Sequence, residues 1–354
     1  MQHKVDAPVL YDAAQTRTEA LEEFVLWTVF GLFVGVAMAI DLGAIGALRR
    51  MLGKGSQPEK ATEKNSTFRQ ALMWTVVWIS LAAIFAGIIY ARSGYGSMLE
   101  FVTGYTLEKS LSVDNMFVFI IIFSSLGIPH HLQHRVLSVG IISAIGMRIP
   151  LIIAGASLLE SFHWMMYLFG AFLVATAIRM AIQKKEDKID IEKNLAVRFL
   201  KKFVPIAPEL HGNKFFVRLA DGALYATAMM VALVIIEMTD LVFAIDSIPA
   251  VLAITTDPFI VITSNVFAIL GLRSLYFLLA GMMEKFRYLK PALVALLLFI
   301  GTKMLLSDWF KIPVEISLAV IFLILGVALG LSFVKARMEN NIHSVSRKDH
   351  HSKE

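Results

Sequence analysis

Nine long apolar stretches constrain this chain more than any other feature of its sequence. A membrane-spanning helix needs roughly 20 predominantly apolar residues. The stretches cover about residues 24–48, 71–92, 98–127, 135–158, 161–183, 223–253, 259–283, 288–306 and 313–335. They are long and lack the alternation of a strand, so we expect an all-α integral membrane protein with about nine transmembrane helices. The composition agrees, because 57% of the 354 residues are hydrophobic and only 17% are charged.

The basic residues sort to one side of the predicted spans. If the N-terminus lies outside, the inside segments carry 24 of the 33 Lys and Arg residues and the outside segments carry four. Cytoplasmic loops are enriched in these residues, so we expect the N-terminus outside and the C-terminus in the cytoplasm. The net charge of +5 then marks cytoplasmic loops, and nucleic acid is not expected as a partner.

These assignments divide the chain into three parts. Residues 1–23 are predicted as an extracytoplasmic tail, residues 24–335 as the transmembrane domain, and residues 336–354 as a polar, disordered cytoplasmic tail. The only long cytoplasmic loop covers residues 184–222, and we expect a short amphipathic helix in it near Leu195–Phe203.

The transmembrane domain contains an internal repeat, because spans 3–5, about residues 98–183, resemble spans 6–8, about residues 223–306. In both copies the second span carries an arginine and, farther along, an Ala-Gly pair. In both copies the third span ends with a basic residue and then Met. Since three is an odd number of spans, we expect the second copy to be inverted, with a substrate site near the midplane between the copies. Chance similarity among apolar helices is the alternative.

Two registers of this repeat are open. Counting back from the mid-span arginine of each copy aligns Asp114 with Asp240. Both motif helices also carry an acidic residue, five further residues and then an Asp, and this pattern aligns Glu108 with Asp240 and Asp114 with Asp246. The sequence does not choose between the two.

Six carboxylates lie within the predicted spans, where a charged side chain costs roughly 2.5–3.5 kcal/mol at the bilayer centre. They are Asp41, Glu108, Asp114, Glu237, Asp240 and Asp246. Only three basic residues, Lys109, Arg148 and Arg273, lie near mid-span, so negative charge is in excess. The surplus favours a cation site. Structural ion pairs between helices are the alternative, with the two arginines as counter-ions. Asp41 either lines the pathway or lies at the cytoplasmic interface.

The residue types in the spans indicate which cation the site would bind. The chain has no cysteine, and no His lies deep in a span. Sites made only of oxygen atoms suit Mg²⁺, Ca²⁺ and Mn²⁺. Met116, Met147 and Met238 lie beside charged positions and would add a soft ligand that favours Mn²⁺, unless they are packing residues. Pro249, close after the last acid of span 6, predicts a broken helix there in which carboxylates and free carbonyls converge.

Other motifs are weak or missing. His130, His131 and His134 form the pattern H-H-x-x-H in a predicted cytoplasmic loop, which suits either a metal-sensing site or a solvated loop. No P-loop, G-x-S-x-G or H-E-x-x-H pattern occurs, so an enzyme is not expected. An intramembrane aspartyl protease would need a G-x-G-D motif, which is also missing.

The acidic motifs resemble those of the TerC/Alx family of integral membrane proteins. The resemblance rests on Glu108-Lys-Ser-Leu-Ser-Val-Asp-Asn-Met-Phe-Val-Phe119, on Glu237-Met-Thr-Asp-Leu-Val-Phe-Ala-Ile-Asp-Ser-Ile-Pro-Ala250 and on Thr256-Asp-Pro-Phe-Ile-Val-Ile-Thr-Ser-Asn-Val-Phe-Ala-Ile-Leu-Gly-Leu-Arg273. It covers all nine spans and is strongest to the Alx-type branch. The histidine loop and the tail look less like the family pattern.

This resemblance implies a bacterial inner-membrane exporter of Mn²⁺. The ligands that it implies are Glu108, Asp114, Glu237, Asp240 and Asp246, with Asn115 as a neutral ligand. We expect secondary transport with alternating access and no bound cofactor, and proton antiport fits because bound metal expels protons from its ligands. Two alternatives stay open: a Ca²⁺ or Mg²⁺ transporter, and a membrane scaffold or metal-delivery partner that transports nothing and depends on the loop 184–222. The sequence points to no particular protein partner.

Overall fold

The computed structural model describes most of the chain, which divides into two units. The described residues are 24–39, 63–182, 195–207, 212–219, 222–280 and 288–351. The first unit covers Met1–Glu59 and the second covers Lys60–Glu354. Asp41 and the predicted tail 1–23 lie outside the described residues.

In the first unit the described part is one apolar helix, Phe24–Ala39. It lies inside the first predicted span. The Thr28 hydroxyl donates to the Phe24 carbonyl one turn earlier at 2.7 Å, and the Trp27 and Phe30 rings meet edge to face with centroids 6.2 Å apart.

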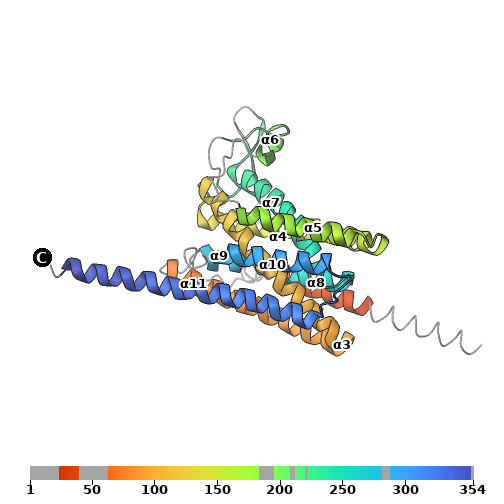
Figure 1. Ribbon diagram of the computed structural model, residues 1–354. Helices are drawn as coiled ribbons and strands as arrows, with labels where there is room; N and C mark the ends of the chain where they lie inside the picture. Colours follow the sequence, from red (N-terminus) through yellow and green to blue (C-terminus); the bar gives the residue numbers. More distant parts are fainter. Residues whose placement is uncertain are drawn as a thin grey trace, which may run out of the picture. The chain divides into compact units, whose positions relative to one another are not determined.

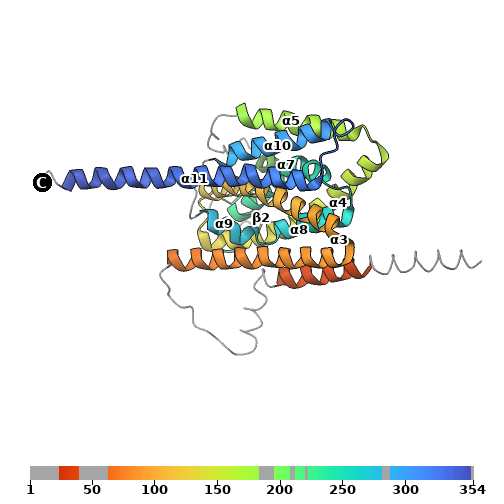
Figure 2. The ribbon, with the colours of Figure 1, turned by 60° about the horizontal axis from the view of Figure 1, so that its bottom comes forward.

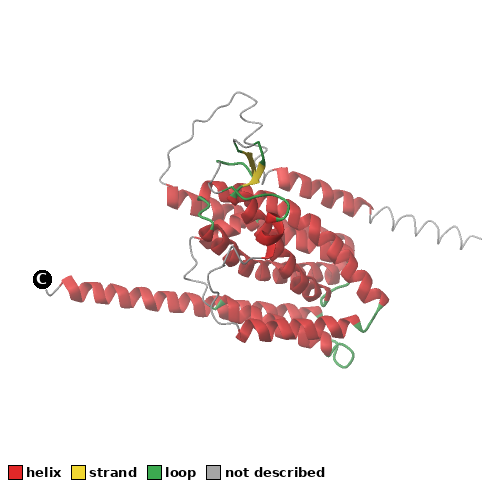
Figure 3. Cartoon of the chain, turned by 90° about the horizontal axis from the view of Figure 1, so that it is seen from above, coloured by secondary structure: helices red, strands yellow, loops and turns green. Residues whose placement is uncertain are grey.

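The second unit is built almost entirely from helices. Its elements are α3 (Glu63–Ser125), α4 (His130–Ser161), α5 (Met165–Ile182), α6 (Leu195–Lys201), β1 (Phe216–Arg218), β2 (Leu224–Ala226), α7 (Ala228–Leu252), α8 (Pro258–Ile269), α9 (Leu272–Ala280), α10 (Leu289–Leu305) and α11 (Val314–His351) (Figure 1). Figure 3 shows that the strands form one short pair among the helices. The expected all-α class therefore holds for the membrane part.

Several of these helices are long and apolar enough to cross a bilayer. Five meet this criterion: α3 from Phe68 onward, α4, α5, α7 and the Val314–Ser332 part of α11. The pair α8 and α9, bent by 41°, adds a sixth. The chain is thus a multi-spanning helical membrane protein, and the count of nine spans stays a prediction.

The long helix α3 reverses direction at Gly94. This glycine has φ 86° and ψ −176°, a backbone conformation that only glycine adopts readily. The rings of Phe85 and Phe101 lie 5.4 Å apart, although 16 residues of unbroken helix would extend about 24 Å. The two parts of α3 therefore lie antiparallel, and they correspond to the predicted spans 71–92 and 98–127.

A second break lies at Gly271, between α8 and α9. The break that was expected at Pro249 does not occur. Gly271 has φ 82°, and a Cβ atom there would lie 2.6 Å from the Trp78 ring. Helix α7 instead continues through Pro249 to Leu252. A proline has no backbone N–H, so Pro249 removes one hydrogen bond to the carbonyl one turn earlier. Because only three residues follow it in the helix, the last turn still forms.

The loop between α5 and α7 contains the short helix that was expected near Leu195–Phe203, now seen as α6. Its residues Ala196, Val197 and Leu200 are buried in a cluster with α7. The antiparallel strands β1 and β2 were not expected, because three-residue strands are too short to show alternation. The prediction of a disordered tail is wrong for residues 336–351, which continue helix α11.

Three helix pairings hold the second unit together. Helix α5 packs on α10, α4 packs on α7, and α3 packs on α8 and α9 (Figures 1 and 2). The first pair is unusually close, because a Cβ atom on Gly170 would lie 2.9 Å from the Gly301 carbonyl oxygen, and the reverse holds at the same distance. Glycine at both positions lets the two backbones touch.

Candidate functional site

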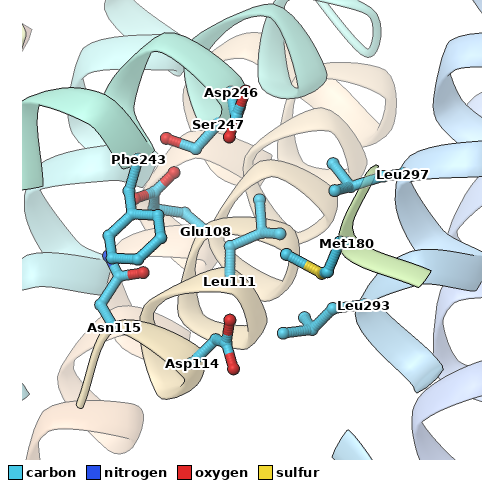
Figure 4. A pocket seen from close by; sticks show the side chains of 10 residues that line it. All are labelled: Glu108, Leu111, Asp114, Asn115, Met180, Phe243, Asp246, Ser247, Leu293 and Leu297. Atoms are coloured by element: carbon cyan, nitrogen blue, oxygen red, sulfur yellow. The ribbon is translucent and has the colours of Figure 1, made fainter. Parts of the chain in front are cut away.

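Four of the predicted metal ligands line one pocket, which we call the first pocket. Its walls are Glu108, Leu111, Asp114 and Asn115 of α3, Met180 of α5, Phe243, Asp246 and Ser247 of α7, and Leu293 and Leu297 of α10 (Figure 4). The polar side chains come from α3 and α7, the two motif helices. The wall formed by α5 and α10 is apolar apart from one thioether.

Figure 4 shows how the polar groups are spread around this pocket. Asp246 and Ser247 lie at one end and Asp114 at the other, with Glu108 and Asn115 between them along one side. The described residues contain no group of three or more His, Asp or Glu side chains close enough to hold one metal ion together. The acids therefore share a pocket without converging on a single point.

Two buried oxygen atoms of the first pocket have no hydrogen-bond partner. They are Glu108 Oε2 and Ser247 Oγ, on side chains whose residues are 1% and 3% exposed. Asp246 accepts a hydrogen bond from the Thr176 hydroxyl at 3.1 Å. An unpartnered carboxylate oxygen in a buried setting is costly, and a bound cation would remove that cost.

Arg148 joins this pocket to a second group of acids. It extends from α4 between the two motif helices and is 2% exposed. Its Nη1 donates to Glu108 Oε1, its Nη2 lies 2.9 Å from Asp240 Oδ1, and its Nε lies 3.2 Å from Asp240 Oδ2. Asn265 Oδ1 on α8 completes the arrangement at 3.4 Å from Nη1. The expectation that Arg148 is a counter-ion fits these contacts.

The two remaining predicted ligands, Glu237 and Asp240, line a different cavity, which we call the second pocket. Its walls are Met116, Phe119, Leu137, Gly140, Ile141, Ala144, Ile236, Glu237, Asp240, Leu272 and Arg273. Neither buried oxygen of Glu237 has a hydrogen-bond partner. The nearby Ser143 hydroxyl donates to the carbonyl of Gly140 in its own helix at 3.1 Å.

The other two mid-span bases lie at the break between α8 and α9 and in the second pocket. Lys109 follows Glu108 directly, yet its Nζ donates to the carbonyls of Ala268 and Leu270 at 3.0 and 3.4 Å, where α8 ends. Arg273 lines the second pocket and donates to the Ser138 hydroxyl at 3.1 Å. Lys109 therefore stabilises the break between α8 and α9.

The methionine and histidine predictions have mixed outcomes. Met116 lines the second pocket, whereas Met238 is 47% exposed, and Met180, which was not singled out, faces the first pocket. The histidine loop is the start of α4. There His134 stacks on Phe277 at 3.9 Å and the His130 ring meets the Gln133 side chain at 3.2 Å.

Three polar residues around the motif acids were not predicted as site residues from the sequence. Thr176 of α5 donates to Asp246, Ser247 lines the first pocket, and Asn265 of α8 contacts Arg148. Each is a polar residue within a predicted span, and this is the signal that could have identified it. A small polar residue in a span is common, however, so the signal is weak without neighbours.

Comparison with known proteins agrees with this architecture. A multi-spanning helical chain with paired acidic helices around a membrane pocket is a transporter-like integral membrane protein. The profile of the integral membrane protein TerC family matches residues 93–340, and the chain belongs to this family.

Its relatives cover nearly the whole chain. An uncharacterized membrane protein of Myxococcus xanthus is 44% identical over 313 residues, which are 88% of this chain and 93% of the relative. Two proteins called Alx, which their names provisionally describe as membrane-bound redox modulators, are each 43% identical. The one from Photorhabdus laumondii covers 86% of this chain and 93% of its own length, and the one from Escherichia coli K12 covers 85% and 91%. No solved structure is significantly similar to the chain.

Proposed function

We propose that the protein is a secondary transporter that exports Mn²⁺ across the bacterial inner membrane. The observation that carries this proposal is the first pocket, where buried, unpartnered oxygen atoms of Glu108 and Ser247 face the same space as Asp114, Asn115 and Asp246. Oxygen atoms of this kind bind hard divalent cations. The Met180 thioether in the same wall favours Mn²⁺ over Ca²⁺ and Mg²⁺, because it is a softer donor.

The separation of the acids fits alternating access. Asp114 and Asp246 lie at opposite ends of the pocket, so an ion reaches all its ligands only after α3 and α7 move together, or through bound water. A site that is only partly assembled holds its ion weakly, and this allows release. In this proposal Glu237 and Asp240 serve the same ion in the second pocket, before or after it occupies the first.

The helix pairings support an inverted repeat. Helix α4 runs parallel to α7, since Gly140 lies beside Glu237 and Gly155 beside Leu252. The part of α3 after Gly94 runs parallel to α8 and α9, since Gly104 lies beside Ser264 and Phe123 beside Tyr276. Helices α5 and α10 are antiparallel, since Met166 lies beside Ser307 and Val174 beside Gly301. An inverted pair of three-helix units gives this reciprocal pattern, in which the second helix of each unit lies along the first helix of the other.

The close pair Gly170 and Gly301 also supports one register. These glycines are 131 positions apart in the sequence, and Glu108 and Asp240 are 132 apart. Both members of the second pair also bind the same arginine. We therefore favour the alignment of Glu108 with Asp240 and of Asp114 with Asp246.

The direct test is Mn²⁺ flux in proteoliposomes under an imposed pH gradient, with Ca²⁺ and Mg²⁺ compared in parallel. We expect saturable Mn²⁺ flux that Asp114→Asn lowers by at least about tenfold, since weaker perturbations of metal sites already cost 10–100-fold. Glu160→Gln is the matched control, because Glu160 is an exposed acid at the end of α4. Unchanged flux in Asp114→Asn would contradict the site, and flux of Ca²⁺ or Mg²⁺ alone would contradict the substrate.

A scaffold or metal-delivery role is the second candidate. It is favoured by the ordered cytoplasmic elements α6, β1 and β2, where the Phe199 and Phe203 rings pack edge to face at 5.0 Å and are 60% and 69% exposed. This role predicts no flux from the purified protein and loss of function when both rings are replaced by alanine. The redox role in the names of the relatives cannot use thiols in this chain, which contains no cysteine.

A further inference from the structure

Arg148 contacts one wall residue from each of two separate pockets. Its guanidinium binds Glu108, which lines the first pocket, and Asp240, which lines the second. The two pockets have no lining residue in common, although α3 and α7 contribute to both. The guanidinium is therefore the charged connection between them.

The contacts on the two sides of Arg148 are unequal. Asp240 is held by two nitrogens of the guanidinium, Nη2 and Nε. Glu108 is held through Oε1 alone and keeps Oε2 free toward the first pocket. Glu108, which makes fewer contacts with Arg148 than Asp240 does, is therefore the residue with an oxygen available to a second cation.

The chemistry of arginine suits an exchange between these partners. The guanidinium stays charged at any physiological pH and offers five N–H donors in a rigid plane, so it can release one carboxylate while keeping another. Asn265 accepts from the same Nη1 that serves Glu108 and provides a neutral partner when that carboxylate leaves. The other basic residue beside Glu108, Lys109, instead donates to backbone carbonyls where α8 ends.

We propose that Arg148 is a tethered cation that competes with the transported ion for Glu108 and Asp240. This inference rests on the transport function proposed above. When an ion enters the first pocket, it takes Glu108, and Arg148 binds Asp240 alone. When the ion occupies the second pocket it takes Asp240, and Arg148 returns to Glu108. The two pockets are then filled in turn, and Arg148 is a positioning residue that links their occupancies.

The first test compares equilibrium Mn²⁺ binding with Mn²⁺ flux in the full-length protein. The key variant is the double substitution R148Q/D240N, which keeps the formal charge of the three-residue cluster at −1 and so avoids two uncompensated acids. We expect it to bind Mn²⁺ at least about tenfold more tightly, because Glu108 has lost its competitor, and to transport at least about tenfold more slowly. R148K keeps the charge but not the planar fork, and we expect smaller changes of the same sign.

Lys303→Gln is the control, since Lys303 is an intramembrane base that donates to Ser317 at 3.0 Å and lines neither pocket. We expect it to change neither binding nor flux. A parallel loss of binding and flux in the Arg148 variants would make Arg148 a structural residue and overturn the proposal. Unchanged flux with unchanged affinity would overturn it as well.

A second measurement needs no variant. Because the proposal makes occupancy of the two pockets mutually exclusive, the wild-type protein should bind one Mn²⁺ per chain at saturation. Two Mn²⁺ per chain would overturn it. If the wild-type protein shows neither saturable Mn²⁺ binding nor flux, the transport function itself is wrong. If it shows both and the double variant binds no more tightly, only the tether is wrong.

Discussion

The first and second pockets are built from the same two motif helices, yet their carboxylates have different partners. In the first pocket Asp246 accepts a hydrogen bond from Thr176 and is attracted by Arg179 of α5, and Glu108 keeps one buried oxygen free. In the second pocket Asp240 gives both oxygens to Arg148. Arg148 therefore leaves one oxygen of its first-pocket partner Glu108 available to a cation, whereas it occupies both oxygens of its second-pocket partner Asp240.

Helix geometry explains how one motif serves both pockets. Asp240 and Asp246 are six residues apart on α7, so they point about 120° apart around the helix. One faces α4 and its arginine, and the other faces the space between α3, α5 and α10. Glu108 lies between the two groups, so substitutions in either pocket test its role from a different side.

The largest expected effect concerns the ion-pair side. Replacement of Arg148 by methionine would leave Glu108 and Asp240 buried without a counter-charge, and we expect it to lower the free energy of unfolding by about 3–5 kcal/mol. The measurement is unfolding by SDS titration in mixed micelles. Lys303→Met removes a base that donates to Ser317 and attracts Glu100, and it should cost clearly less because Glu100 is only partly buried. Equal losses in both variants would show that the bridge between the pockets has no special role.

The next effect concerns the cation side. Asp246→Asn keeps the shape of the side chain and its hydrogen bond to Thr176 but removes a ligand charge from the first pocket. We expect Mn²⁺ flux to fall by on the order of 100-fold, at the upper end of the range for perturbed metal sites, with little change in stability. Glu237→Gln in the second pocket should lower flux less. The reverse ranking in the flux assay would exchange the roles of the two pockets.

A third prediction concerns the α5–α10 contact, which forms part of the wall of the first pocket alone. A methyl group on Gly301 would press on the Gly170 carbonyl at 2.9 Å, so Gly301→Ala should destabilise the protein by about 1–3 kcal/mol. Gly326→Ala on α11, where a Cβ atom would meet nothing within 4 Å, is the matched control. The same SDS titration measures both, and equal stability would mean that the helices are not tightly packed.

The smallest effect concerns the hydroxyl that orients Asp246. Thr176→Val removes one hydrogen bond to this carboxylate, worth about 1.5–3 kcal/mol at most when the acceptor is charged. We expect Mn²⁺ affinity to fall about fivefold to tenfold, and Thr176→Ser to restore it. Thr106→Val removes a hydroxyl that bonds only its own helix, at 2.7 Å to the Val102 carbonyl, and should leave affinity unchanged. Equal affinities in all three variants would exclude an orienting role.

Much of the site could be predicted because buried charge is rare and therefore informative. Six residues were predicted from the sequence as ligands of one site. Four of them line the first pocket, and Glu237 and Asp240 line the second. The helices were equally predictable, since long apolar runs without the alternation of a strand satisfy their backbone hydrogen bonds in lipid as helices.

The errors came from features that depend on tertiary packing. The sequence did not show that Asp240 shares Arg148 with Glu108, because Arg148 lies 92 positions away from Asp240 and no local pattern reports that pairing. The sequence predicted a helix break in the wrong span, at Pro249 of α7. The real break lies at Gly271, where the packing of Trp78 requires both a missing side chain and a positive φ. Such a requirement becomes visible only when the neighbouring helix is in place.

The most direct test of the account is to locate the ion in the protein. Crystals of the wild-type protein grown with Mn²⁺ would be measured on both sides of the manganese absorption edge, so that anomalous scattering marks the metal. We predict one strong peak in the first pocket, in contact with Glu108 and Asp246, with Arg148 bound to Asp240 alone. A peak elsewhere, or a fully loaded protein in which Arg148 still holds Glu108, would contradict the account.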